Sequence, residues 1–98
     1  MRMLLTVEMD TTTSNEAIQQ GTLLQTMEGA LQNLRPEAAY FTVQNGRRTA
    51  YIFFDLTDTA QMPKISEPFF MGTGAKVSFC PVMNAGELRE GLSSIMPS

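Results

Sequence analysis

Hydrophobic and polar residues alternate on both sides of Asn45-Gly46, and this pattern predicts a β-hairpin. The segment 38–54 reads AAYFTVQNGRRTAYIFF, and both halves are rich in aromatic and β-branched residues. Asn-Gly is a preferred pair for a two-residue type I′ turn, in which both central residues have positive φ. The turn sets the register of the two strands, so we expect Tyr40 to face Tyr51.

The same periodicity predicts a strand over 2–9 and a long helix after it. Thr13 and Glu16 have the spacing of a capping box, and Pro36 ends the segment near Leu34. The expected helix has about five turns at 3.6 residues per turn. Gly21 should let this helix approach the sheet closely. Its apolar stripe would consist of Ile18, Gly21, Leu24, Met27, Leu31 and Leu34.

A second helix is predicted after Leu56, with Asp58 and Gln61 at capping spacing. Met62, Ile65 and Phe69 would share one face of it, and Pro68 should kink or end it. Gly72-Thr73-Gly74 then reads as a turn before a fourth strand over 75–83. Pro81 places that strand at a sheet edge, and Asn84 should cap a last helix over about 85–95.

The element order βαββαβ plus a C-terminal helix predicts a single α+β domain over residues 1–98. Two right-handed split crossovers give a ferredoxin-like antiparallel sheet with strand order 4-1-3-2 and both long helices on one face. The residues expected to face the helices are Met3, Leu5, Val7, Phe41, Val43, Ala50, Ile52, Phe54, Val77 and Phe79.

The opposite face of the predicted sheet is apolar enough to need a cover. Leu4, Tyr40, Tyr51 and Phe53 would form a contiguous patch on it. Large exposed apolar patches generally mark interfaces. The simplest cover is the same face of a second copy, which predicts a two-fold homodimer.

Composition narrows the possible functions. The chain is 43% hydrophobic with a net charge of −3, which disfavours nucleic acid and anionic membranes as partners because both require a basic patch. There is no histidine, and Cys80 is the single cysteine. We therefore expect no metal, no cofactor and no internal disulfide, and a reducing cytoplasm as the compartment. No apolar run approaches the length of a membrane span.

The chain resembles the dimeric α/β-barrel superfamily, and more narrowly an uncharacterised small branch of it. The resemblance rests on the element order and on three segments, LRPEAAYF, NGRRTAYIFFDL and FCPVMN. It implies two ferredoxin-like sheets packed face to face in a dimer. Members include cofactor-free monooxygenases, isomerases, haem-handling enzymes and sensing domains. The histidine and tryptophan that such haem enzymes and monooxygenases use are absent here, so those activities do not carry over by residue.

The candidate site residues lie on the predicted dimer face. Glu8 should share one end of that face with Arg47 or Thr49 on one side and with Lys76 on the other. It is the weak candidate for a catalytic general base, and an ion pair on a sheet rim is the alternative. Tyr40, Tyr51 and Thr42, with Arg47 and Lys76, are the candidate ligand-binding residues, and packing at the seam is the alternative for the tyrosines. Cys80 is expected to be a small buried hydrophobe.

Three functions remain open from the sequence. The first is a homodimer that binds a small apolar or aromatic molecule and acts as a cofactor-free isomerase or monooxygenase-like enzyme. Its pocket would lie at the seam, or between sheet and helices near Gly21 and the 69–71 run. The second is a non-catalytic ligand-sensing or dimerisation module, and the third is a purely structural dimer.

Overall fold

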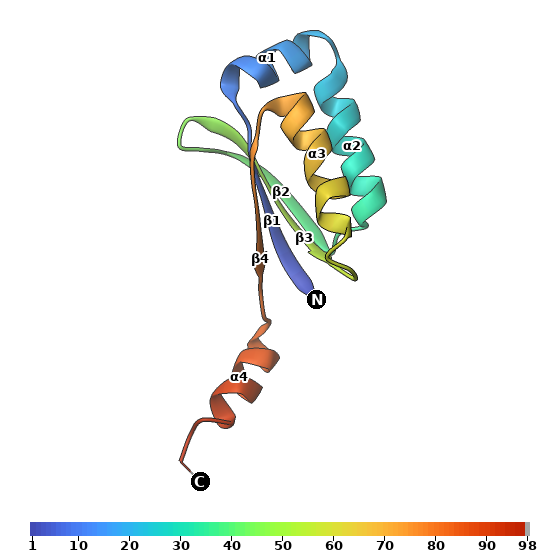
Figure 1. Cartoon of the computed structure of the whole chain (residues 1–98). Coiled ribbons are helices and arrows are strands. Elements are labelled where there is room, and N and C mark those ends of the chain that lie inside the picture. The colour runs from blue at the N-terminus through green and yellow to red at the C-terminus, as the bar shows by residue number, and fades with distance from the viewer. Residues whose placement is uncertain (98) are drawn as a thin grey trace.

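The computed structural model describes residues 1–97, which form an α+β fold with four helices and a four-stranded antiparallel sheet (Figure 1). The sheet order is β2-β3-β1-β4, which is 4-1-3-2 counted from the β4 edge. Helices α2 and α3 lie along one face, and the other face has no helix, an arrangement consistent with a ferredoxin-like fold. The elements are β1 (Arg2–Glu8), α1 (Thr11–Gln19), α2 (Thr22–Leu34), β2 (Ala38–Gln44), β3 (Arg47–Asp55), α3 (Gln61–Thr73), β4 (Lys76–Pro81) and α4 (Ala85–Ser93).

The central hairpin has the predicted turn and register. Asn45 and Gly46 have φ values of 56° and 72°, as a type I′ turn requires. Tyr40 lies opposite Tyr51 across β2 and β3, as the sequence predicted. This part of the fold is specified locally, because the turn alone fixes which residues pair.

The long helix predicted from Thr13 to Leu34 is instead two helices, and its predicted start was wrong. Asp10 is the N-cap of α1, and its carboxylate accepts hydrogen bonds from the backbone N–H and the hydroxyl of Thr13, both at 2.9 Å. Gly21 has a φ of 74° and separates α1 from α2. A Cβ at Gly21 would meet no atom within 4 Å, so its predicted close approach to the sheet was also wrong.

The break at Gly21 changes which side chains face the core. Ile18 and Leu24 of the predicted stripe are 49% and 67% exposed. Met27 is buried as predicted. The residues of α2 that pack around it are Leu23, Ala30, Leu31 and Leu34.

Helix α3 begins slightly later than predicted and continues through its proline. The N-cap is Ala60, whose N–H donates to the Asp58 carboxylate at 2.9 Å. Pro68 lies inside the helix, which runs to Thr73 and ends at Gly74. Pro68 therefore does not end α3, and that part of the prediction was wrong. Gly72 belongs to the last turn of the helix, and only Gly74 takes the left-handed conformation.

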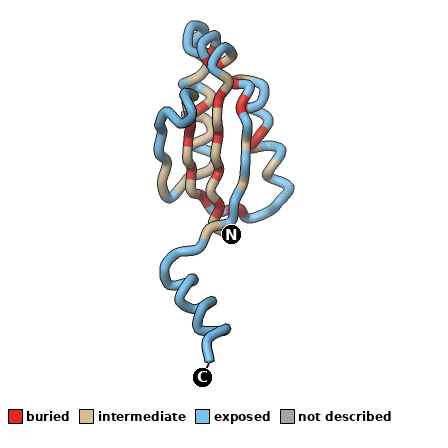
Figure 2. The backbone as a smooth tube through the Cα atoms, turned by 90° about the vertical axis from the view of Figure 1, so that its left-hand side faces the viewer, coloured by how far each residue is buried: buried red, intermediate tan, exposed pale blue. Residues whose placement is uncertain are grey.

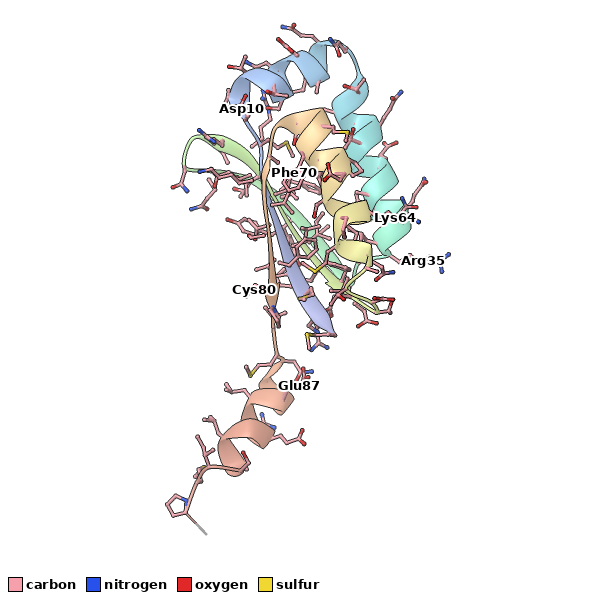
Figure 3. All side chains as sticks on the ribbon, viewed as in Figure 1. Asp10, Arg35, Lys64, Phe70, Cys80 and Glu87 are labelled. Atoms are coloured by element: carbon pink, nitrogen blue, oxygen red, sulfur yellow. The ribbon has the colours of Figure 1, made fainter. Side chains whose placement is uncertain are left out.

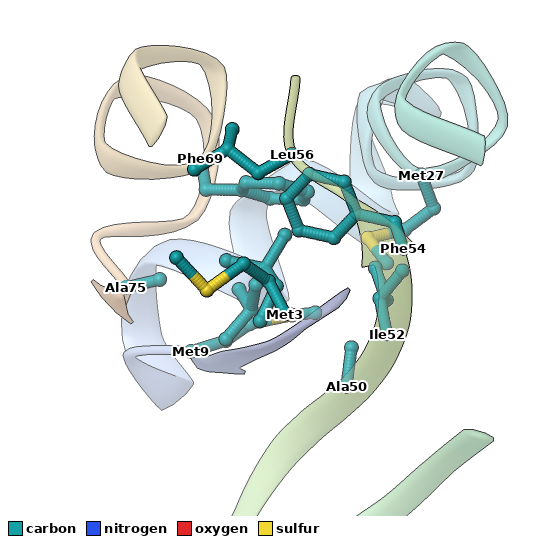
Figure 4. Packing of buried hydrophobic residues seen from close by; sticks show 11 residues of the cluster. Met3, Met9, Met27, Ala50, Ile52, Phe54, Leu56, Phe69 and Ala75 are labelled. Atoms are coloured by element: carbon teal, nitrogen blue, oxygen red, sulfur yellow. The ribbon is translucent and has the colours of Figure 1, made fainter. Parts of the chain in front are cut away.

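The core lies between the sheet and the two helices α2 and α3 (Figure 4). Phe69 of α3 is fully buried, as are Leu5, Val7 and Ile52 of the sheet. Phe54 and Phe79 pack edge to face, with ring centroids 6.3 Å apart. These residues match the predicted helix-facing set on β1, β3 and β4.

The residues of the edge strand β2 that were predicted to face the helices are not buried by them. Phe41 and Val43 lie on the helix side of the sheet, but they are 54% and 72% exposed. The helices cover the middle of the sheet and stop short of this part of the β2 edge, so the two side chains have no cover from their own chain.

Gly74 and Gly21 offer a matched test of close packing at the end of α3. Both have positive φ, but a Cβ at Gly74 would lie 3.1 Å from Asp10 Cβ and from Thr13 Oγ1, whereas Gly21 faces open space. A non-glycine residue in the left-handed conformation costs about 1–2 kcal/mol. We expect Gly21→Ala to lose about that much stability in urea unfolding, and Gly74→Ala to lose about 2–3 kcal/mol because the clash adds strain. Equal losses would show that the end of α3 does not press on Asp10.

Helix α4 projects away from the rest of the chain (Figures 1 and 2). The molecule measures 60 × 28 × 18 Å and has a radius of gyration of 16.0 Å, against about 13 Å for a compact chain of this length. Asn84 caps the helix in a complete capping box with Glu87, as the sequence predicted for its start. Pro81 ends β4, which is an edge strand as predicted.

The start of α4 is tied to the sheet by one ion pair, Arg2 Nη1 to Glu87 Oε1 at 2.5 Å. Arg2 also pairs with Glu37 at 2.8 Å. A hydrogen bond from the Asn84 backbone N–H, together with the Arg2 guanidinium, lowers the pKa of Glu87. A lowered pKa stabilises the folded state above the ordinary glutamate value of about 4.3, and this contribution is lost as the pH falls through the folded value.

Acidification below about pH 4 should therefore loosen α4. We expect amide exchange at residues 88–93 to rise in acid before exchange in the sheet does. Glu87→Gln retains a capping side chain but no charge, so the protection of its α4 amides should not change with pH across this range. Identical acid sensitivity in both proteins would assign the loosening to another group.

Candidate functional site

The sequence-predicted site residues lie together on the helix-free face of the sheet, which faces the viewer in Figure 2. One row across the four strands is Thr42, Thr49, Glu8 and Lys76, each opposite its neighbour in register. The next row is Tyr40, Tyr51, Thr6 and Ser78. The predicted placement of Glu8 between strands β3 and β4 is confirmed.

Glu8 is part of an ion pair on this face. Its Oε1 lies 3.8 Å from Arg47 Nη1, and Lys76 lies opposite it on β4. The side chains of Glu8 and Arg47 are 24% and 40% exposed. The geometry is that of a partly shielded rim pair, and such pairs are usually structural.

The two tyrosines give the face its aromatic centre. The Tyr51 hydroxyl donates a long hydrogen bond of 3.4 Å to Gln44 Oε1. Tyr40 is 64% exposed, which is high for an aromatic side chain in a folded domain. Cys80, expected to be buried, is exposed on β4 (Figure 3) because the single chain leaves this face open.

A separate cleft of about 450 Å³ lies between α2 and α3, above the end of β3. Its apolar part is formed by Ala30, Leu34, Phe54 and Ile65. One of the two pocket locations suggested by the sequence lay between sheet and helices, near Gly21 and residues 69–71; the cleft is lined by other residues, and Phe69 is fully buried in the core. The remaining lining residues are Gln25, Thr26, Gly29, Asn33, Asp55, Gln61, Lys64 and Pro68.

The polar groups of the cleft are suited to orienting a bound molecule. Lys64 is labelled on the α3 side in Figure 3. Pro68 has no N–H to donate to the Lys64 carbonyl four residues earlier, so an acceptor is left without its helical partner at this wall. Asp55 is already paired with the N-terminal ammonium group, at 2.6 Å. The unpaired polar groups of the cleft are thus mostly neutral amides, apart from Lys64.

One sequence signal could have revealed this cleft. Gln25, Gly29 and Asn33 follow each other at four-residue spacing, which places them on one face of α2 beside the core stripe. When a helix face of small and polar residues adjoins its buried face, the short side chains leave a gap against the neighbouring helix. A Cβ on Gly29 would meet no atom within 4 Å.

A second hollow of about 420 Å³, beside the start of α4, is dominated by charge. Arg2 lines it and is neutralised by Glu37 and Glu87, whose hydrogen bonds raise the pKa of its guanidinium. Because the charges in these ion pairs cancel, little net charge remains to attract a ligand. This hollow is therefore the weaker candidate site.

Two further properties bear on function. Within residues 1–97, no group of three or more histidine, cysteine, aspartate and glutamate side chains is arranged to hold a metal ion. No helix in the same range has the length and apolar character that crossing a bilayer requires.

Comparison of the chain with protein-family models, with curated proteins and with solved structures finds no match. The fold, the helix-free sheet face and the cleft between α2 and α3 therefore carry the functional argument.

Proposed function

We propose that this chain is a homodimeric ligand-binding protein that holds a small apolar or aromatic molecule in the cleft between α2 and α3. The observation that carries the proposal is the cleft itself, whose volume of about 450 Å³ and mixed lining are those of small-molecule sites. Phe54 and Ile65 supply apolar contact, and the neutral amides and Lys64 supply orientation.

The dimer of the proposal forms through the helix-free faces of two copies, which would create the α/β barrel expected from the resemblance. The support is a sheet face that no helix of the same chain covers, on which Tyr40 is exposed and Leu4, Tyr51 and Phe53 are half-buried. The exposed thiol of Cys80 suits a reducing compartment, and we place the protein in the cytoplasm on that ground.

The cleft offers little for acid–base catalysis, and this favours binding. Its ionisable lining residues are Asp55 and Lys64, and Asp55 is already paired with the N-terminal ammonium group. Proton transfer needs a titratable side chain within reach of the reacting atom. A non-catalytic ligand-sensing module is therefore the function that fits this cleft best.

The second candidate is a cofactor-free isomerase or monooxygenase-like enzyme at the dimer seam. It is supported by the row that holds Glu8, Thr42 and Lys76 beside the row of the tyrosine pair, and by the pairing of Arg47 with Glu8. A thermal-shift comparison separates the two sites. A ligand of the seam would lose its effect in Glu8→Gln, whereas a ligand of the cleft would not.

Gly29→Leu should fill the cleft and abolish ligand binding without harming the fold. Leucine in a helix interior is favoured over glycine by nearly 1 kcal/mol, so we expect the variant to be about 0.5–1 kcal/mol more stable. The probes are small phenols, aromatic carboxylates and lactones, screened by thermal shift. A compound at one hundred times its Kd should stabilise the unmodified chain by about 2.7 kcal/mol and Gly29→Leu not at all.

Gly29→Ala is the matched control, because it gains the same helix propensity and leaves most of the cleft open. It should respond to the compound like the unmodified chain. A compound that stabilises all three proteins equally binds elsewhere, and that result would refute the cleft as the site. A broad screen with no stabilising compound would count against ligand binding altogether.

A further inference from the structure

The C-terminal arm, residues 82–97, carries an apolar stripe that its own chain does not cover. Leu88 and Leu92 lie one helical turn apart on α4 and are 48% and 47% exposed, and Ile95 beyond them is 77% exposed. Apart from the Arg2–Glu87 ion pair at its start, the helix stands clear of the sheet and of α2 and α3 (Figure 2).

The same chain has a second uncovered apolar surface on the helix side of β2. It consists of Phe41 and Val43, which are 54% and 72% exposed. An edge strand with exposed large apolar side chains is an aggregation hazard unless another segment covers it. The apolar stripe of the arm and the apolar surface of β2 could therefore cover each other.

The two surfaces lie far apart within one chain. Strands β2 and β4 form opposite edges of the sheet, about 14 Å apart at 4.8 Å per strand spacing. The arm leaves β4 near Met3, whereas Val43 lies opposite Arg48 at the hairpin end, whose carbonyl bonds the N–H of Met9. That offset is about 20 Å along β1.

We propose that the C-terminal arm docks on a second copy of this chain, with Leu88 and Leu92 packed on Phe41 and Val43 of the partner. The proposal rests on the homodimer proposed above. When two sheets pack orthogonally face to face, one of their two-fold arrangements brings the hairpin end of the partner's β2 to the end of β4 where the arm departs.

The area of the sheet face supports a contribution from the arm. Four strands about 4.8 Å apart and six to seven residues long present a flat area of roughly 400 Å². Two such faces project to roughly 800 Å², so even with the relief of their side chains the accessible area that they bury lies near the lower end of the 1,200–2,000 Å² of specific, stable interfaces. Two exchanged arms would add contact area and remove the exposed stripe from water.

A cross-linking experiment on the full chain tests the exchange. In a Cys80→Ser background, Val43→Cys and Leu92→Cys are combined, and the protein is mildly oxidised at a concentration where sedimentation shows a dimer. We expect most of the chain to run as a covalent dimer on a non-reducing gel. Val43→Cys combined with Ser93→Cys is the matched control, because residue 93 lies on the far side of α4 and should not cross-link.

Each other outcome counts against the exchange. A covalent dimer from Leu92→Cys alone would mean that the two arms pack on each other. A dimer in sedimentation without any cross-link would refute the exchange and leave the sheet-face dimer intact. A monomer in sedimentation would refute both the exchange and the proposed dimer.

A second measurement uses charge in place of cysteine. Leu88→Glu with Leu92→Glu should raise the dimer dissociation constant by at least about 100-fold, because two buried leucines are lost from each arm. Gly86→Glu with Ser93→Glu adds the same charge on the opposite face of α4 and should leave the constant within a few-fold. Equal effects of the two pairs would show that net charge, rather than the stripe, controls assembly.

Discussion

Tyr51→Asp is expected to convert the proposed dimer into a monomer. Tyr51 lies on β3 between Tyr40 of β2 and Thr6 of β1, at the centre of the helix-free face. In the dimer the new carboxylate would be buried between two sheets without a partner, which costs about 3–5 kcal/mol. We expect the dissociation constant, measured by sedimentation equilibrium, to rise about 100- to 5,000-fold.

The fold of the single chain should survive this change. Tyr51 is only half-buried, and its hydroxyl makes one long hydrogen bond. Circular dichroism of Tyr51→Asp should therefore match that of the unmodified chain. This separates a loss of association from a loss of structure.

Phe70→Asp is the matched control for the interface. Phe70 is 43% exposed on α3 (Figure 3), on the side of the sheet away from the proposed seam. It also replaces an exposed aromatic residue with a carboxylate, and it should leave the dissociation constant within a few-fold. If Tyr51→Asp sediments as an unperturbed dimer, or if both variants dissociate equally, the seam lies elsewhere.

Local chemistry made the hairpin predictable from sequence. Asn45-Gly46 fixes the turn, the turn fixes the register, and the register places Tyr40 and Tyr51 on one face. The row containing Glu8 and Lys76 follows from the order of the strands and the two-residue alternation of side chains. The hairpin depends on residues close in sequence, whereas the row depends on the long-range pairing of β1 with β3 and β4.

The helices were less predictable, because their boundaries depend on competition between similar local signals. Thr13 offered a capping box with Glu16, but Asp10 caps the helix one turn earlier with a stronger acceptor. Gly21 fits both a continuous helix and a break, and nothing local in the sequence selects its positive φ. The cleft depends on the resulting placement of α2 against α3, so it was missed.

The exposure of the β2 side chains also could not be predicted from the hydrophobic pattern. Phe41 and Val43 alternate as core residues do, and the alternation correctly gives the side of the sheet that they face. It does not say how far the helices extend over that side. The uncovered part of β2 is a property of the helix lengths and of the break at Gly21.

Phe69→Ala is expected to have the largest effect on the stability of the single chain. Phe69 is fully buried and packs between α3 and the sheet (Figure 4). Truncating a buried phenylalanine costs about 3–5 kcal/mol, through lost burial and the cavity left behind. A domain of this size has a total stability of about 5–15 kcal/mol, so the variant should be at or near the limit of folding.

The neighbouring Phe70→Ala serves as the control, because it removes the same atoms from a position that is 43% exposed. We expect it to cost under about 1 kcal/mol in urea unfolding, with an unchanged slope against denaturant. A large difference between the two variants would fix the rotation of α3 about its axis, and with it the wall of the cleft that carries Lys64 and Pro68. Similar losses would mean that α3 is rotated in solution, and the cleft between α2 and α3 would then have a different lining.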